Sequence, residues 1–417
     1  MTVPILLTIL AYLVSTAASI APRISLWGSY QRLQGTYTTF SYLVICGLLL
    51  EGLRTRAQLE RIVTAVILTS LPIALYGLVQ HHALDLLPWG GDVTSRVASN
   101  LGNAIFVSAY LIMVIPLTVV RWLALQRRAL EDQPHTSRWF IALCVWLLWL
   151  GQAIAWFALP IGQAMAANLL LIAILALLAR YVQAPVRRFA LMGAYASLFA
   201  VQLICLIFSQ SRGPLLGLLA GMFLLGIIYL IVFHYRRGAL PLALLGLAGV
   251  FFLILLNVPG VPLESVRRLP YIGRLGRVLE MEKGSGRVRV LIWQGNVELL
   301  QSNPLRVMTG YGPEAMYVAY NRFYPPELGH YEARNASPDR SHNETFDALI
   351  MTGVLGLAAY LALFSALFYW GFTWLGLVPN RRARSLFWLT LAGGGLAGAL
   401  IPFFITKGWV FFGVGLP

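Results

Sequence analysis

Long uncharged apolar runs recur along the whole of this chain, and they constrain its fold more than any other feature. A helix that crosses a bilayer needs about 20 consecutive apolar residues, and each run is close to that length. The runs are continuous rather than alternating, which favours helices over a membrane β-barrel. Charged residues are only 11% of the 417, whereas a soluble domain carries roughly a quarter. We therefore expect an all-α integral membrane protein.

The apolar runs predict about eleven transmembrane helices in a single membrane domain, residues 1–417. The first run lacks the basic residues that open a signal peptide, so we interpret it as a span. One long polar segment, residues 257–342, separates the ninth span from the tenth, and we expect it to be a partly helical loop. The predicted spans are 3–20, 37–53, 61–80, 104–121, 139–158, 161–179, 188–208, 213–233, 239–256, 347–375 and 386–405.

Arginine residues gather on one side of these spans. The richer side holds 15 arginines in its short loops and the other side holds four. Basic residues mark cytoplasmic loops, so the amino terminus is predicted to be cytoplasmic and the 257–342 loop extracytoplasmic. The same rule, with anionic lipid, accounts for the net charge of +15, so we expect membrane lipids and no nucleic acid as partners. The richer set is Arg54, Arg56, Arg61, Arg121, Arg127, Arg128, Arg138, Arg180, Arg187, Arg188, Arg236, Arg237, Arg381, Arg382 and Arg384.

Arg212 departs from this charge bias. It lies in the tight turn before the eighth span, on the side of the large loop, and Pro214 suits the first turn of the following helix. A guanidinium at the membrane edge is either an interfacial anchor or a binder of an anionic group such as a diphosphate.

A second basic residue, Arg289, belongs to a predicted helix over residues 287–301. Val290, Trp293, Val297 and Leu300 fall on one face of it. An amphipathic helix at the membrane surface is the plainer interpretation. A nucleotide-binding loop at the preceding glycines is disfavoured, because no strand precedes them.

His342 is the candidate base. Ser341 with Glu344 predicts a capping box, which puts His342 at the first position of the tenth span. The helix dipole there disfavours imidazolium and attracts phosphate oxygens. A surface histidine beside a helix cap is the alternative. Competing bases that spacing does not exclude are His330, Glu332, Asp339 and Glu344.

These motifs together resemble the bacterial O-antigen ligase and O-antigen polymerase-like family of polytopic glycosyltransferases. The resemblance rests on short motifs between about 209 and 360, in the family's order. They are Ser211-Arg212-Gly213, Arg289-x-x-x-Trp293, Asn303-Pro304-Leu305, Gly310-Tyr311-Gly312, Ser341-His342-Asn343 and Gly353-Val354-Leu355-Gly356-Leu357. Family members commonly have about twelve spans, so the resemblance also implies a missing twelfth span or a truncated chain.

The resemblance implies transfer of a glycan from undecaprenyl diphosphate to a lipid or cell-envelope acceptor at the outer face of the bacterial cytoplasmic membrane, with inversion and without metal or cofactor. Arg212 and Arg289 would bind the diphosphate, and His342 would deprotonate the acceptor hydroxyl.

Several functions remain open. Polymerisation of repeat units and protein-directed oligosaccharide transfer share these motifs. A flippase or transporter of lipid-linked glycans would need polar residues inside the spans, and Gln152, Gln163 and Gln202 are the main ones present. A purely structural membrane protein gives no account of the large loop. The sugar, the acceptor and the oligomeric state are not encoded in these patterns.

Overall fold

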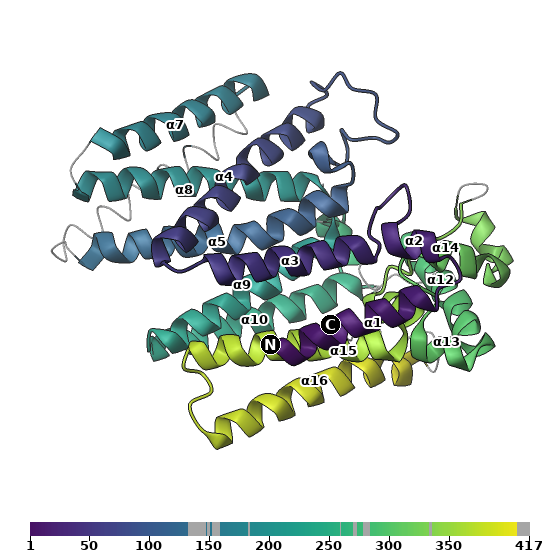
Figure 1. Ribbon diagram of the computed structural model, residues 1–417. Helices are drawn as coiled ribbons and strands as arrows, with labels where there is room; N and C mark the ends of the chain where they lie inside the picture. Colours follow the sequence, from purple (N-terminus) through teal and green to yellow (C-terminus); the bar gives the residue numbers. More distant parts are fainter. Residues whose placement is uncertain are drawn as a thin grey trace. The chain divides into compact units, whose positions relative to one another are not determined.

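The computed structural model describes residues 1–131, 147, 151, 159–181, 184–258, 260–269, 273–277, 284–332 and 336–406 (Figure 1). Every regular element in those residues is a helix. They pack as two compact units: a terminal unit, Met1–Leu53 with Glu280–Pro417, and a central unit, Arg54–Leu279.

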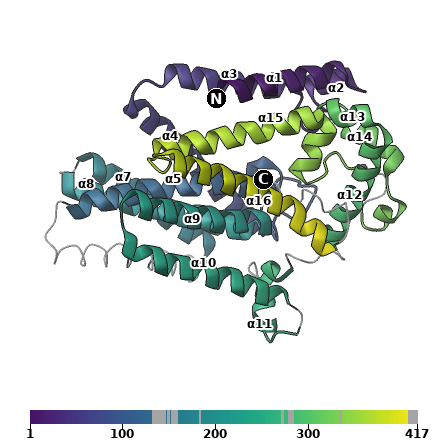
Figure 2. The same cartoon turned by 90° about the horizontal axis from the view of Figure 1, so that it is seen from below.

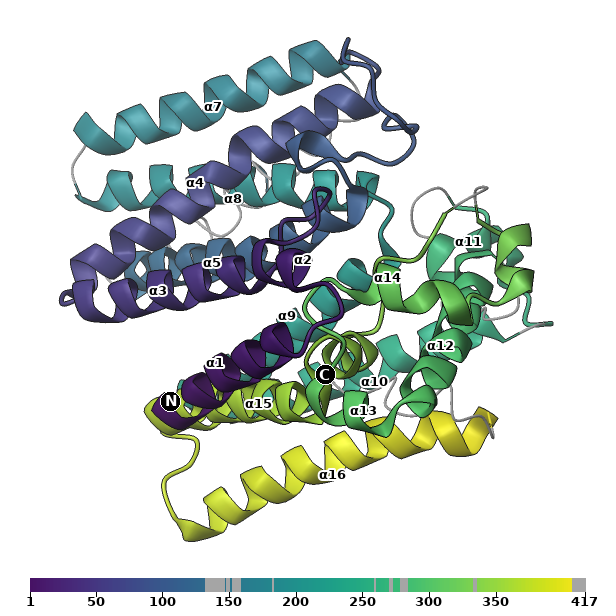
Figure 3. The ribbon, with the colours of Figure 1, turned by 45° about the vertical axis from the view of Figure 1, so that its right-hand side comes forward.

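The terminal unit combines membrane helices with most of the large polar loop. Its elements are α1 (Thr2–Ala17), α2 (Pro22–Trp27), α3 (Thr36–Gly52), α12 (Gly284–Ser302), α13 (Pro304–Thr309), α14 (Met316–Ala319), η3 (Tyr320–Phe323), η4 (Pro326–His330), α15 (Glu344–Trp374) and α16 (Arg381–Thr406). α1 packs along α15, and the loop helices α12, α13 and α14 gather with α2 at one end of α15 (Figures 2 and 3). The loop is therefore a folded helical cap on that end of α15.

The helical cap has its own apolar core. Its buried side chains come from α12, from the segment around α14, η3 and η4, and from the first turns of α15. Burying them stabilises the cap by roughly 1.5–3 kcal/mol per large side chain. The core residues are Leu291, Ile292, Trp293, Leu299, Tyr311, Met316, Tyr320, Leu328, Phe346 and Ile350. The predicted helix over 287–301 is thus confirmed as α12, with Trp293 on its buried face.

α15 is broken at Gly353, whose φ of 69° only glycine adopts readily. A Cβ at Gly353 would meet the carbonyl of Met308, and a Cβ at Gly310 would meet that of Met351. At the break, the carbonyls of Ile350 and Met351 accept hydrogen bonds from the backbone N–H groups of Tyr311 (2.7 Å) and Gly312 (3.0 Å). Gly310 and Gly353 therefore allow the two backbones to approach closely enough to form these hydrogen bonds.

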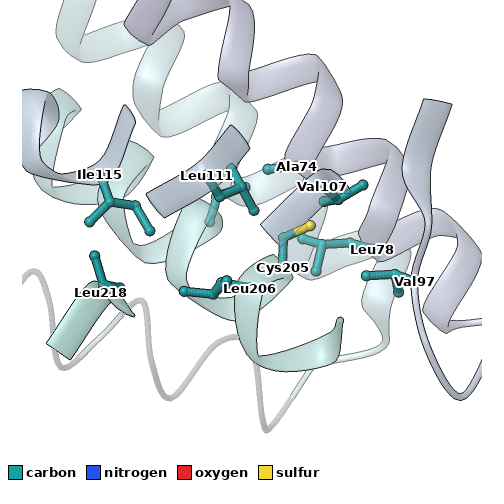
Figure 4. Packing of buried hydrophobic residues seen from close by; sticks show 10 residues of the cluster. Ala74, Leu78, Val97, Val107, Leu111, Ile115, Cys205, Leu206 and Leu218 are labelled. Atoms are coloured by element: carbon teal, nitrogen blue, oxygen red, sulfur yellow. The ribbon is translucent and has the colours of Figure 1, made fainter. Parts of the chain in front are cut away.

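The central unit is a bundle of long helices. It holds α4 (Arg56–His81), η1 (Ser99–Leu101), α5 (Ala104–Glu131), α7 (Ile161–Tyr181), α8 (Ala184–Phe208), α9 (Arg212–Val232), α10 (Arg236–Asn257), α11 (Glu264–Arg267) and η2 (Gly273–Arg277). Its apolar core is built mainly from α4, α5 and α8, with Leu218 of α9 (Figure 4). Cys205 lies in that core, and a Cβ at Gly77 would be 2.7 Å from its Sγ, so α4 and α8 pack closely.

Gln202 of α8 is buried in the same bundle and links three helices through hydrogen bonds. Its side-chain amide donates hydrogen bonds to Ser70 Oγ of α4 (2.7 Å) and Thr118 Oγ1 of α5 (3.1 Å). Such bonds hold helices together where water is absent. Gln163 is exposed, and Gln152 lies outside the described residues. Gln202 therefore has a structural role rather than lining a path.

The membrane class is confirmed, but the count of eleven spans is not. Ten of the predicted segments coincide with a helix, and residues 139–158 lie almost wholly outside the described residues. Seven of the helices searched are long and apolar enough to cross a membrane, and α1 is shorter at 16 residues. The seven are Arg56–His81, Ala104–Arg128, Arg187–Phe208, Arg212–Val232, Arg237–Asn257, Glu344–Trp374 and Arg381–Phe404.

Several arginines counted as loop residues belong to helices. α5 continues to Glu131, so Arg121, Arg127 and Arg128 lie in its last turns, and α16 begins at Arg381. Long basic side chains at helix ends reach the interface by snorkelling, which lets a span run past its apolar stretch.

Candidate functional site

His342 lies in the turn before α15, not in its first helical position. Asn343 is the N-cap, because its Oδ1 accepts from the N–H groups of Thr345 (2.9 Å) and Phe346 (3.3 Å). The predicted Ser341–Glu344 capping box is therefore wrong. Asparagine caps at least as well as serine, and the Ser341 hydroxyl instead bonds Asp347. His342 has a left-handed backbone, with φ of 53°.

The turn carrying His342 is fixed from two sides. The indole Nε1 of Trp293, on α12, donates a 2.8 Å hydrogen bond to the carbonyl of Ser341. The N–H and hydroxyl of Ser341 both donate to Oδ1 of buried Asp347, in the first turn of α15. A non-glycine residue with positive φ costs free energy, and such strain persists at sites whose surroundings determine it. The cap and the span together thus set where the imidazole lies.

The surroundings of His342 favour the neutral form of its imidazole. Partial desolvation is the main cause that lowers the pKa, and the positive charge of Arg289 lowers it further, while Asp347 and Asp339 partly oppose this. The ring nevertheless remains accessible to solvent. These causes differ from the helix dipole that the sequence analysis considered, because His342 lies outside the helix. A neutral, accessible imidazole can accept a proton.

Arg289 lies on the same helix as Trp293, one turn earlier, and is exposed. Its neighbour Arg287 has a different role: it makes a bidentate pair with Glu327 at 2.7 Å, which joins α12 to η4. Bidentate pairs of this kind fix geometry. Within the terminal unit, Arg289 is close enough to His342 for its positive charge to lower the pKa of the imidazole.

Arg32 and Asp339 form an ion pair that sequence reasoning missed. Arg32 Nε donates to Asp339 Oδ2, and Nη2 donates to Oδ1 at 3.2 Å. Burial alone would raise the pKa of Asp339, but the hydrogen bond and charge of Arg32 bring it below its usual value. An engaged, acidic carboxylate is a poor base, so Asp339 is a weaker candidate than His342. The pair spans 307 positions, and no local pattern signals it.

The 28–34 segment after α2 reaches the same end of the unit through two more contacts. The N–H of Ser29 donates to buried Glu314, and Arg340 Nη2 donates to Gln34 Oε1 at 2.5 Å. Glu314 is 4.0 Å from Arg340. Residues 28–34 therefore line the turn that carries His342.

Arg212 belongs to the central unit, at the start of α9. Ser211 is the N-cap, so Arg212 is the first helical residue and Pro214 lies in the first turn, as predicted. Arg212 lines a small cavity with Gln210, Ser211 and Arg274. Whether Arg212 approaches Arg289 and His342 stays a prediction.

Arg274 is a second basic residue beside the Ser209–Arg212 turn, and the sequence analysis did not single it out. It lies in η2, inside the large loop, and its Nη1 donates to the carbonyl of Gln210 at 3.1 Å. Arg96 Nε donates to the carbonyl of Ser209 at 3.5 Å. Guanidinium groups therefore surround a turn whose Gln210 has φ of 51°. The signal that could have identified Arg274 is the Gly273-x-x-Gly276 spacing around it, typical of a tight turn.

Comparison with known proteins identifies a domain in this part of the chain. Residues 196–361 match the family described as O-antigen ligase, about two fifths of the 417 residues. The match begins within α8, includes Arg212, Arg289 and His342, and ends in α15 beyond Gly353. No curated protein and no solved structure matches the chain. The resemblance inferred from the short motifs is thereby confirmed for these residues.

Proposed function

Because the chain carries an O-antigen ligase domain at residues 196–361, we propose that it transfers a glycan from undecaprenyl diphosphate to an acceptor hydroxyl. The match to this family supports a membrane glycan-transferring enzyme of the ligase or polymerase type. The main support for this proposal is the geometry of the turn that carries His342. Trp293 and Asp347 fix this turn through hydrogen bonds to Ser341, and the positive charge of Arg289 acts on the imidazole.

His342 acts as the general base in this proposal. The neutral imidazole takes the proton of the acceptor hydroxyl, and the acceptor oxygen forms a bond to the anomeric carbon. The bond from that carbon to the diphosphate oxygen breaks, so undecaprenyl diphosphate leaves and the configuration inverts. Positioning and charge stabilisation, rather than an acid, assist the leaving group.

Arg289 and Arg212 bind the diphosphate in this proposal. The planar fork of a guanidinium matches two phosphate oxygens, which a point charge does not. Arg274 extends the proposed phosphate-binding surface, because it lines the same cavity as Arg212. The reaction needs no metal or cofactor in this scheme, so we expect a chelator to leave the transfer rate unchanged.

The first test is His342→Ala in membranes supplied with a lipid-linked glycan donor and acceptor. We expect transfer to fall at least about 100-fold, the range of a general base, with expression and donor binding preserved. His330→Ala is the matched control, because His330 is an exposed histidine of the same loop. Full activity in His342→Ala would remove it as the base.

The product decides between ligation and polymerisation. A glycan attached to a new lipid or cell-envelope acceptor indicates a ligase, and a lengthened lipid-linked chain indicates a polymerase. Movement of the intact lipid-linked glycan across the bilayer, without transfer, would instead indicate a flippase.

The proposed location is the outer face of the cytoplasmic membrane, with 257–342 as the extracytoplasmic catalytic loop. A His330→Cys variant tests this in intact cells with an impermeant thiol reagent. Labelling above that of the parent chain supports the orientation, and its absence contradicts it.

A further inference from the structure

A cavity of about 350 Å³ lies in the central unit, away from the Ser209–Arg212 turn. Three helix ends form it: the start of α4, the last turns of α5 and the last turns of α9, whose chain directions Figure 1 shows. Its lining residues are Arg56, Val120, Leu123, Ala124, Arg127, Arg128, Leu225, Tyr229 and Phe233.

The cavity combines positive charge with apolar walls. Three of its nine lining residues are arginines and none is a carboxylate. Arg127 lies over the ring of Phe233, with its Cζ 4.4 Å from the ring centroid, so a cation–π contact holds it at the wall. Arg56 is 2.9 Å from Glu60, an exposed pair that contributes little and leaves the guanidinium able to bind another anion.

The cavity lies about a membrane's thickness from Arg212. α9 runs from Arg212 to Val232, 21 residues, which is roughly 30 Å at 1.5 Å per residue. Tyr229 and Phe233 are at its far end, and roughly 30 Å is the thickness of the hydrocarbon layer. A ligand in this cavity therefore occupies the opposite leaflet from an anion at Arg212.

We propose that this cavity binds the phosphate headgroup of an acidic phospholipid. Arg56, Arg127 and Arg128 bind the phosphate, since basic pockets between membrane helices favour anionic headgroups. One acyl chain lies against the apolar side chains of α5 and α9. Those walls favour a lipid over a free phosphate ion, and Leu218 is the fully buried residue of α9, so much of the helix keeps apolar surface that an acyl chain can contact.

The test is lipid binding by the purified full-length chain. The chain is reconstituted in phosphatidylcholine nanodiscs containing phosphatidylglycerol, and retained lipid is measured by native mass spectrometry after detergent exchange. For the double variant Arg127→Gln, Arg128→Gln we expect phosphatidylglycerol to bind roughly 10- to 30-fold more weakly, from about a factor of five for each basic residue. Phosphatidylcholine retention should not change.

The matched control is Arg381→Gln, Arg382→Gln. It removes the same charge from exposed positions at the start of α16, which do not line the cavity. Equal loss in both double variants would mean general electrostatic attraction and would overturn the site. Unchanged binding in Arg127→Gln, Arg128→Gln would overturn it as well.

A second variant tests the cavity without changing charge, and guards against misfolding of the first. Ala124→Trp places an indole in the cavity from an exposed position on α5. We expect it to weaken phosphatidylglycerol binding at least about fivefold. The melting temperature in phosphatidylcholine alone should be unchanged. Retention equal to the parent would show that the lipid binds elsewhere. Competition by inorganic phosphate at equal concentration would show an ion site rather than a lipid site.

Discussion

The indole N–H of Trp293 donates a 2.8 Å hydrogen bond to the carbonyl of Ser341, the residue that precedes His342. This bond joins α12, which carries Arg289, to the turn that carries the proposed base. It gives the Arg289-x-x-x-Trp293 spacing a physical meaning. One helix presents a guanidinium from one turn and fixes the histidine's backbone from the next.

Trp293→Phe should slow transfer by about tenfold, because losing one buried hydrogen bond costs roughly 1–1.5 kcal/mol. Phenylalanine keeps an aromatic ring against Phe346, but the lost bond should also lower the melting temperature slightly. The measurement is kcat and KM for the donor, and we expect the loss in kcat. Trp27→Phe, at an exposed position, is the control. An unchanged kcat would show that this bond does not position His342.

Arg289→Lys and Arg212→Lys should each lower transfer by roughly 10- to 100-fold, because an ammonium cannot replace a bidentate fork on phosphate. Transfer rate and donor affinity in membranes provide the check. Arg322→Lys is the control, at an exposed position of η3 in the same unit. If both proposed phosphate-binding arginines tolerate lysine, the diphosphate role is wrong.

The acid limb of the pH profile should lie below pH 6.5. A base must be neutral to act, and desolvation together with Arg289 lowers the pKa of His342 from its ordinary value. Activity is therefore retained as pH falls to about 6.5 and is lost only below that. Arg289→Gln removes a positive charge that disfavours imidazolium, so it should raise this pKa and shift the limb to higher pH. The position of the limb in kcat/KM is the readout, and a limb that stays in place would contradict the assignment.

Gly353→Ala should lower the free energy of unfolding by about 2–4 kcal/mol, because an alanine at this positive φ is strained and its Cβ clashes with the opposing backbone. Its Cβ would meet the carbonyl of Met308. The melting temperature in detergent measures this. Gly371→Ala is the control in the same helix, because a Cβ there meets nothing within 4 Å. A variant at 353 as stable as the control would mean that the pairing of the two backbones carries little of the stability.

Local patterns predicted those parts of the molecule that local physics determines. Apolar run length located the helices, and the spacing of Val290 and Trp293 predicted α12 and its buried face. The predicted N-cap of α15 was wrong because Ser341 and Asn343 are both residues that cap helices well. Only the contact of Ser341 with Asp347 decides between them.

Contacts between distant segments had no sequence signature. Arg32 meets Asp339 across 307 positions, and Arg274 meets Gln210 across 64. Each pair depends on how helices far apart in the chain pack. The break at Gly353 likewise follows from the approach of residues 308–312 rather than from the glycine alone, since Gly356 and Gly371 of the same helix stay helical.

The pairing of Tyr311 and Gly312 with the carbonyls of Ile350 and Met351 also limits how this protein can open. If residues 310–312 moved away, the carbonyl of Ile350 would lose this partner at the bend of a membrane helix, where little water is present, at a cost of several kcal/mol. The carbonyl of Met351 would keep its hydrogen bond from Ser15 Oγ. Opening at this bend is therefore unfavourable. A movement that admits the acceptor of the proposed reaction must therefore leave this pairing intact.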